Sequence, residues 1–243
     1  RRVLFRSADP GRWEELPAEV REWLRLQRVF SVMPRADGLL VEVFPRGGKS
    51  FLVAYCFEGR HAHQTLGMLL TRRMERFGLK PQGFVANEYA LAVWGLEDAG
   101  ARAAQPGFLA PLFDEDMLGD DLEAWLQESA LMKKTFRNCA VISGLIERRF
   151  PGKEKTGRQV TISTDLVYDV LRRHEPDHIL LRAARDDALT GLLDLARLAQ
   201  MLGRVSGKLL HKRLARISPL AVPVMLEIGR EPVYGEAQDV ILR

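Results

Sequence analysis

Two runs of β-forming residues, Leu39–Phe44 and Phe51–Phe57, restrict the possible folds of this chain more than any other pattern in it. The residues between them, Pro45-Arg46-Gly47-Gly48-Lys49, have the composition of a tight hairpin turn. We therefore expect an antiparallel pair of strands here. Two more short strands are expected further along, at Phe84–Asn87 and Tyr89–Gly95.

In most of the remaining sequence the apolar residues recur at helical spacing, which predicts helices there. One such segment, Trp13–Gln27, precedes the hairpin, and another, Ala62–Phe77, follows it. The second half of the chain is expected to be mostly helical, with Leu131–Arg149 as one of its longer helices. We also expect a late strand over Gly207–Leu214 that returns to the first sheet.

A polar, turn-rich segment at residues 98–109 indicates where the chain divides. We predict a mixed α/β subdomain at residues 1–97, a linker at 98–109 and a mainly helical, basic subdomain at 110–243. The predicted fold class is therefore mixed α+β, with a small sheet and hairpin in the N-terminal part and a late strand in the mostly helical C-terminal part. With 243 residues, 47% of them hydrophobic, the chain can bury such a core.

Cysteine content and the absence of targeting signals point to the cell interior. The two cysteines, Cys56 and Cys139, lie in apolar runs and lack the spacing of a metal or redox pair. No apolar run has the length of a membrane span, and no secretory signal is visible. We expect a cytoplasmic protein. Because the chain begins with Arg1 rather than methionine, we also expect it to be a piece of a longer polypeptide.

Two motifs resemble nucleotide-binding sequences but lack essential parts. Gly47-Gly48-Lys49-Ser50 is like the end of a phosphate-binding loop, yet Val43 stands where that loop needs its first glycine, and a strand rather than a helix is expected after the lysine. Asp114-Glu115-Asp116 is like the acidic box of ATPases, but no strand pattern precedes it. We therefore assign no catalytic residue and no cofactor to this chain.

A His-x-His pair, His61 and His63, lies at the expected start of a helix. Side chains two residues apart diverge there, so we predict no metal site. Helix N-termini attract anions, however, and this makes Arg60 and His61 candidates for a phosphate contact.

Charge is concentrated in Leu131–Arg158. From Lys133 to Arg158 there are eight Lys or Arg residues and two acids, a net charge of +6 in a chain whose total is +4. Such a concentration predicts contact with a polyanion. On a helix, one face would carry two small residues between cations and so leave room for a sugar–phosphate backbone. That face consists of Lys133, Arg137, Ala140, Gly144 and Arg148.

A second basic run, Arg204–Arg216, holds five Lys or Arg residues, one histidine and no acid. On a strand its side chains would alternate, with Lys208 and Lys212 on one face and Arg213 on the other. The candidate nucleic-acid contacts are therefore Lys133, Lys134, Arg137, Arg148, Lys153, Lys155, Arg158, Lys208, Lys212, Arg213, Arg60 and His61.

Plainer interpretations of these residues stay open. The basic helix face can be an ordinary solvated face that pairs with the acidic run Asp114–Glu128, which has seven acids and no basic residue. We interpret that acidic run as solvated surface. Trp94, Trp125 and Tyr168 are either stacking platforms for bases or, as we favour, parts of the core.

Long segments of this chain resemble the C-terminal region of large helicase-related (Lhr) proteins, and most closely that of the bacterial ligase-associated DEXH-box DNA helicases. The resemblance extends from about Arg1 to Glu236. It rests on the segments FPRGGKSFLVAYCFEGRHAHQTLGMLLTRRMER, GFVANEYALAVWGL, LFDEDMLGDDLEAWL, LMKKTFRNCAVISGLIERRFPGKEKTGRQVTISTDLVYDVLRRHEPDHILLRAA and ISPLAVPVMLEIGRE.

The resemblance implies a superfamily 2 DNA motor that binds and hydrolyses ATP with magnesium and moves 3′ to 5′ along single-stranded DNA in DNA repair. None of its ATP motifs occurs in this sequence. The implied partners are single-stranded DNA or a tailed duplex, the RecA-like and winged-helix domains of the same protein, a DNA ligase and a nuclease. An RNA–DNA hybrid is a further candidate, and no membrane is implied. The implied location is the nucleoid of a bacterial cytoplasm.

Two hypotheses about function follow. The leading one is a non-catalytic accessory domain of a DNA helicase that guides single-stranded DNA along a basic surface. The alternative is an interaction scaffold, in which the acidic run Asp114–Glu128 docks a repair partner such as a ligase or a nuclease.

Overall fold

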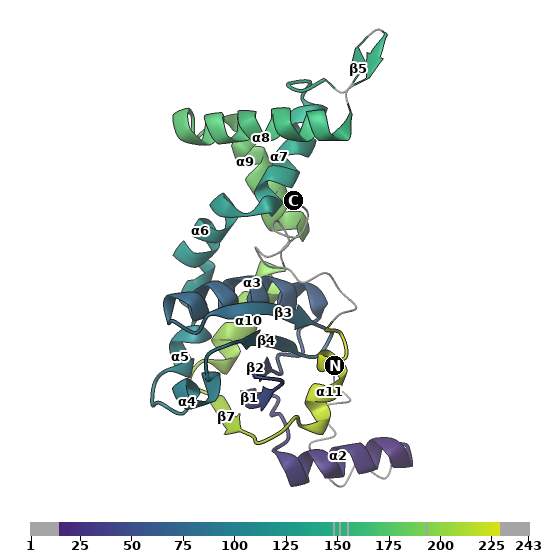
Figure 1. Cartoon of the computed structure of the whole chain (residues 1–243), viewed down its shortest axis with the longest axis vertical. Coiled ribbons are helices and arrows are strands. Elements are labelled where there is room, and N and C mark those ends of the chain that lie inside the picture. The colour runs from purple at the N-terminus through teal and green to yellow at the C-terminus, as the bar shows by residue number, and fades with distance from the viewer. Residues whose placement is uncertain (1–14, 148, 151, 155, 193, 229–243) are drawn as a thin grey trace. The chain divides into compact units, whose positions relative to one another are not determined.

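The computed structural model describes residues 15–147, 149–150, 152–154, 156–192 and 194–228, and it divides the chain into two compact units (Figure 1). Unit 1 is discontinuous and combines the chain up to Asp121 with the chain from Leu195 onward. Unit 2 is the continuous segment Leu122–Asp194. The helices and the five-stranded sheet confirm the predicted mixed α+β class.

Unit 1 is built on a sheet with the strand order β3-β4-β2-β1-β7. Neighbouring strands are antiparallel except for β1 and β7, which are parallel and pair Leu39 with Leu209. The predicted late strand therefore exists and returns to the first sheet. The strands are β1 (Leu39–Arg46), β2 (Lys49–Ala54), β3 (Pro81–Ala86), β4 (Leu91–Gly95) and β7 (Leu209–Arg213).

The turn between β1 and β2 confirms the predicted hairpin. Gly47 and Gly48 have φ values of 57° and 75°, the left-handed conformations that a two-residue hairpin turn requires and that glycine adopts without strain. Strand β2 begins at Lys49, so no helix N-terminus stands behind the Gly-Gly-Lys-Ser sequence. Gly47-Gly48-Lys49-Ser50 therefore resembles a phosphate-binding loop in sequence but not in structure.

The sheet is buried on both faces. On one face the hydrophobic core includes Phe44, Tyr55 and Trp94, and it is covered by α2 (Ala18–Phe30), η4 (Pro219–Ala221) and α11 (Val222–Met225). On the other face α3 (Arg60–Arg76) packs over β3 and β4, and α10 (Leu195–Val205) packs on α3 (Figure 1). The approach of α3 depends on Gly67, because a Cβ there would lie 2.4 Å from the Phe84 ring.

A buried carboxylate joins β1 to three other segments of unit 1. Glu42 on β1 is fully buried, and it accepts hydrogen bonds from the Gln27 amide at 3.0 Å, the Tyr55 hydroxyl at 2.7 Å and the Ser218 hydroxyl. Gln27 also accepts a bond from the Leu220 N–H at 3.0 Å. Burial, followed by the charge of Glu42, raises the pKa of Tyr55 well above its ordinary value, so the hydroxyl keeps the proton that it donates.

Unit 2 is helical with one small hairpin. Helix α7 packs against α8 and α9. The ring of Phe136 on α7 contacts the ring of Tyr168 on α8 edge to face, and the two ring centroids are 5.4 Å apart. The elements are the unit 2 portion of α6 (Asp120–Glu128), then α7 (Ala130–Ile142), β5 (Arg149–Phe150), β6 (Lys153–Glu154), α8 (Gly157–His174), α9 (Ile179–Asp187) and a π-helical turn at Ala188–Leu192. No helix in the described part of the chain is both long and apolar enough to cross a bilayer.

This division differs from the boundaries that the sequence suggested. The segment 98–121 packs into unit 1 through α4 (Ala99–Ala103), α5 (Leu109–Leu112) and η2 (Glu115–Leu118), and residues from 195 onward return to the sheet. The physical reason is that β7 completes the edge beside β1, a pairing that local composition does not reveal. The turn-rich stretch that the sequence predicts as a linker therefore belongs to the first unit.

Candidate nucleic-acid interface

The basic face of α7 is largely turned toward α8. The helix starts at the Ser129 cap, whose side chain accepts a hydrogen bond from the Met132 N–H. Lys133 forms an ion pair of 3.1 Å with Asp169, and Arg137 forms one of 3.0 Å with Asp165. Both candidates are therefore partly neutralised within unit 2 rather than fully available to a polyanion.

The prediction of an open gap between the cations of α7 is wrong. Ala140 is fully buried within unit 2, so it leaves no opening for a backbone. Gly144 does not belong to the helix, because α7 ends at Ile142 and Gly144 takes a left-handed φ of 75°. A glycine in this conformation is a common helix terminator, which explains why the predicted helix to Arg149 is too long.

Two other basic candidates of unit 2 are open to solvent. Lys134 on α7 and Arg158 in the first turn of α8 are both exposed, and neither has an ion-pair partner among the residues that the structure describes. Lys153 lies in β6. The candidates Arg148 and Lys155 lie outside the described residues.

The second basic run forms β7 and its approach in unit 1. Lys208 is exposed just before the strand, Lys212 is half-buried opposite Glu42, and Arg213 is exposed and pairs with Asp98 at 2.9 Å. Burial lowers the pKa of His211 below its ordinary value, and the charges of Arg213 and Lys212 lower it further. The strand thus presents cations along an edge of the sheet, with a histidine that favours its neutral form.

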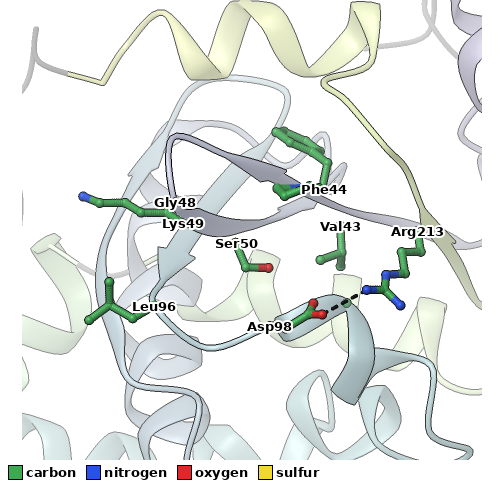
Figure 2. Close-up of a pocket in the computed structure, with 10 residues that line it drawn as sticks. Val43, Phe44, Gly48, Lys49, Ser50, Leu96, Asp98 and Arg213 are labelled. Carbon is green, nitrogen blue, oxygen red and sulfur yellow. Dashed lines mark hydrogen bonds and ion pairs between the residues drawn. The ribbon is translucent and has the colours of Figure 1, made fainter.

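A surface hollow of about 270 Å³ lies where β1 and β7 end and β2 begins (Figure 2). Figure 2 shows the Arg213 and Asp98 side chains paired at one side, whereas Lys49 points away from them. The apolar part of its lining includes Val43 and Leu96. Because its charged groups do not converge on one point, the hollow does not have the arrangement of an anion site.

The His-x-His pair at the start of α3 does not act together. His63 is fully buried, where its Nε2 accepts a bond from the Glu58 N–H at 2.9 Å and its Nδ1 lies 2.6 Å from the Asn87 carbonyl, to which it donates. Both ring nitrogens are therefore engaged in the fold. His61 is exposed and Arg60 half-buried at a helix start that lacks a side-chain cap.

The acidic run is not simply solvated surface, which corrects the prediction. Asp116 and the buried Asp121 both bind Arg73, and Arg76 also binds Asp121. Burial lowers the pKa of Arg73, but its hydrogen bonds to the two carboxylates raise it to a net value above the ordinary one. In unit 2, Glu123 pairs with Arg185. These acids bind arginines of α3 and α9, not the basic face of α7.

The aromatic candidates belong mostly to the core, as favoured. Trp94 and Tyr168 are 5% and 2% exposed, so they offer no stacking surface, and Trp125 is half-buried. The partners that sequence reasoning missed are Asp165 and Asp169, the acids on α8. Their spacing of four residues on one helix was a usable signal, since it matches the spacing of Lys133 and Arg137 on α7.

Comparison with known proteins agrees with the fold. Residues 33–221 match the family model described as DEAD/H associated. A curated relative, "Lhr helicase/ probable uracil glycosylase" of Mycolicibacterium smegmatis, is 25% identical over 212 residues, which are 85% of this chain and 14% of the relative. The chain therefore spans only a small part of that relative's length.

A solved structure of an Lhr helicase also matches this chain. The helicase Lhr of Mycobacterium smegmatis, bound to ssDNA and AMP-PNP, matches with a TM-score of 0.65 and 26% identity. The match covers 84% of this chain and 26% of that one. Fold, sequence and family model thus agree over most of the described residues, and this chain belongs to the DEAD/H associated family, as the corresponding region of Lhr-type helicases does.

Proposed function

We propose that this chain is the accessory domain of an ATP-dependent superfamily 2 DNA helicase of DNA repair, and that it guides single-stranded DNA for a motor that moves 3′ to 5′. The observation that carries the proposal is the match of its fold, over 84% of the chain, to a helicase solved with ssDNA. ATP and magnesium would act in RecA-like domains, with a winged-helix domain beside them, because this sequence contains no ATP motif.

The free cations of unit 2 support the proposed contact with DNA. Lys134 and Arg158 are exposed and have no ion-pair partner in the described residues, so they can exchange counterions for phosphates without breaking an internal bond. Lys133 and Arg137 would first have to leave Asp169 and Asp165. We therefore move the expected main contacts from the paired cations to the free ones.

The exposed cations near β7 are further candidates in unit 1, although Arg213 would first have to leave Asp98. Lys208 and Arg213 lie at opposite ends of a parallel edge strand, where a sugar–phosphate backbone can follow the strand direction. Contacts of this kind hold a strand without reading its sequence, as a translocating motor requires. No aromatic platform is needed for this function.

The test is a salt titration of a fluorescent oligothymidylate with the 243-residue chain, using fluorescence anisotropy. We expect Lys134→Glu and Arg158→Glu each to weaken binding and to reduce the salt slope by about 0.7 per lost phosphate contact. Arg182→Glu is the matched control, because it makes the same charge change on an exposed position of α9. Binding without salt dependence, or equal losses in all three variants, would contradict the proposal.

The scaffold alternative has less support. Asp116, Asp121 and Glu123 already bind arginines of their own units, which leaves less negative surface for a ligase or a nuclease. A pull-down with each candidate partner, using the chain with Asp114 and Glu115 neutralised, tests it directly. Loss of partner binding with unchanged oligonucleotide binding would favour the scaffold over DNA guidance.

A further inference from the structure

Helix α8 carries an exposed apolar stripe on the face opposite its buried side. Three aliphatic side chains spaced four residues apart are 61%, 65% and 49% exposed. This spacing places them on one line about 12 Å long. The opposite face, which contains Val160, Thr164 and Tyr168, is buried. We call the three exposed residues the α8 stripe: Ile162, Leu166 and Val170.

Both ends of the α8 stripe are basic. Arg158 precedes it and Arg173 follows it within the same helical arc, and both are exposed without an ion-pair partner in the described residues. The acids along one flank do not offset them, because Asp165 and Asp169 are paired with cations of α7. An apolar line bounded by unpaired cations therefore faces solvent.

The position of Arg158 does not serve helix stability. It lies in the first turn of α8, where the helix dipole disfavours a cation, and that turn contains no acid. The helix itself therefore gives no reason for a cation at this position. Arg173, in contrast, lies in the last turn, where the dipole favours it.

The chemistry of the α8 stripe indicates which kind of molecule can bind it. Its aliphatic side chains cannot stack on bases as aromatic residues do, so a nucleic acid fits it poorly. A second copy fits poorly as well, because an antiparallel pair of α8 helices centred on Leu166 would bring Arg158 beside His174 at both ends. A parallel pair would place each arginine beside the same arginine of the other copy. A ligand that binds along the stripe should instead carry negative charges near both of its ends, beside Arg158 and Arg173.

We propose that the α8 stripe docks an amphipathic helix of a protein partner, with apolar residues spaced four apart and carboxylates near both ends. Helices of this kind pack along the apolar line of another helix through matching side chains. The carboxylates would pair with Arg158 and Arg173 and fix the register. Of the two free cations assigned to DNA, this surface uses Arg158 and not Lys134, so a docked helix would compete with DNA at Arg158 alone. The proposal stands whether or not Lys134 binds DNA.

The experiment measures fluorescence anisotropy of a labelled helical peptide of the length of α8, with leucines spaced four apart and glutamates in its first and last turns. We expect the 243-residue chain to bind it and Leu166→Lys to weaken binding about tenfold or more, the scale set by one buried leucine. The double variant Arg158→Glu, Arg173→Glu should bind a peptide with lysines in place of the glutamates. Arg182→Glu should bind like the unaltered chain.

Four outcomes would overturn the proposal. They are no binding of the glutamate peptide, equal binding of the glutamate and lysine peptides, displacement of the peptide by oligothymidylate from a variant that carries Arg158→Ala, and self-association that Leu166→Lys abolishes. The last two would make the occupant a nucleic acid or a second copy. Thermal melts of each variant check folding, and Ile162→Lys replaces Leu166→Lys if that variant does not fold.

Discussion

Replacing the buried carboxylate of β1 is the sharpest test of how unit 1 is held together. Glu42→Ala removes the acceptor for three buried donors, from Gln27, Tyr55 and Ser218. Tyr55 and Ser218 lie 3.2 Å apart and can still bond to each other, so not every donor is left without a partner. One or two unsatisfied buried groups at about 1–3 kcal/mol each, plus the cavity, give a loss of about 3–5 kcal/mol.

Urea unfolding and thermal melting of the purified chain measure this loss. For a unit of this size we expect the melting temperature to fall by about 10 °C. Glu42→Gln should lose less, because its amide carbonyl still accepts one of the three bonds. Glu88→Ala is the matched control, since Glu88 is exposed and should change little. If Glu42→Ala melts within about 2 °C of the unaltered chain, the network does not join the segments as we argue.

Three further results are expected. Arg73→Ala should destabilise unit 1 by about 1–3 kcal/mol in urea unfolding, because the buried Asp121 carboxylate loses one of its two arginine partners and keeps only Arg76. The lowered pKa of His211 means that the folded state binds fewer protons, so its contribution to stability is complete above the ordinary value of 6.5 and is lost as the pH falls toward the folded value. His211→Gln should flatten this fall in urea midpoints measured from about pH 7.5 to about pH 5. Gly67→Ala should lower the melting temperature, because the added carbon meets a phenylalanine ring, whereas Gly203→Ala in α10 has room and should raise it slightly.

The elements with a local signal could be predicted from the sequence. The hairpin at Gly47-Gly48 follows from turn chemistry, and the late strand follows from its own composition. The end of α7 was also readable, since Ser143 and Gly144 are typical of a helix terminus. The longer prediction failed because the basic pattern was followed past that signal.

The features that depend on long-range packing could not be predicted. Charge alone does not show that Lys133 and Arg137 bind acids on α8, because those pairs exist only after the two helices pack. The same holds for the buried Glu42, whose partners lie up to 176 residues away in sequence. A count of charges thus pointed to unit 2, but only the fold separated its free cations from its paired ones.

The discontinuity of unit 1 has a consequence for the order of folding during synthesis. Unit 2 is made from one continuous segment, whereas the parallel edge of the sheet joins Leu39 to Leu209, with the whole of unit 2 between them. On the ribosome β1 therefore stays an unpaired edge until β7 emerges, and we expect unit 2 to fold first. Its compact form then brings the two halves of unit 1 closer than an open loop would. Limited proteolysis of ribosome-bound chains that end before and after Leu209 would reveal this order, and early protection of β1 would contradict it.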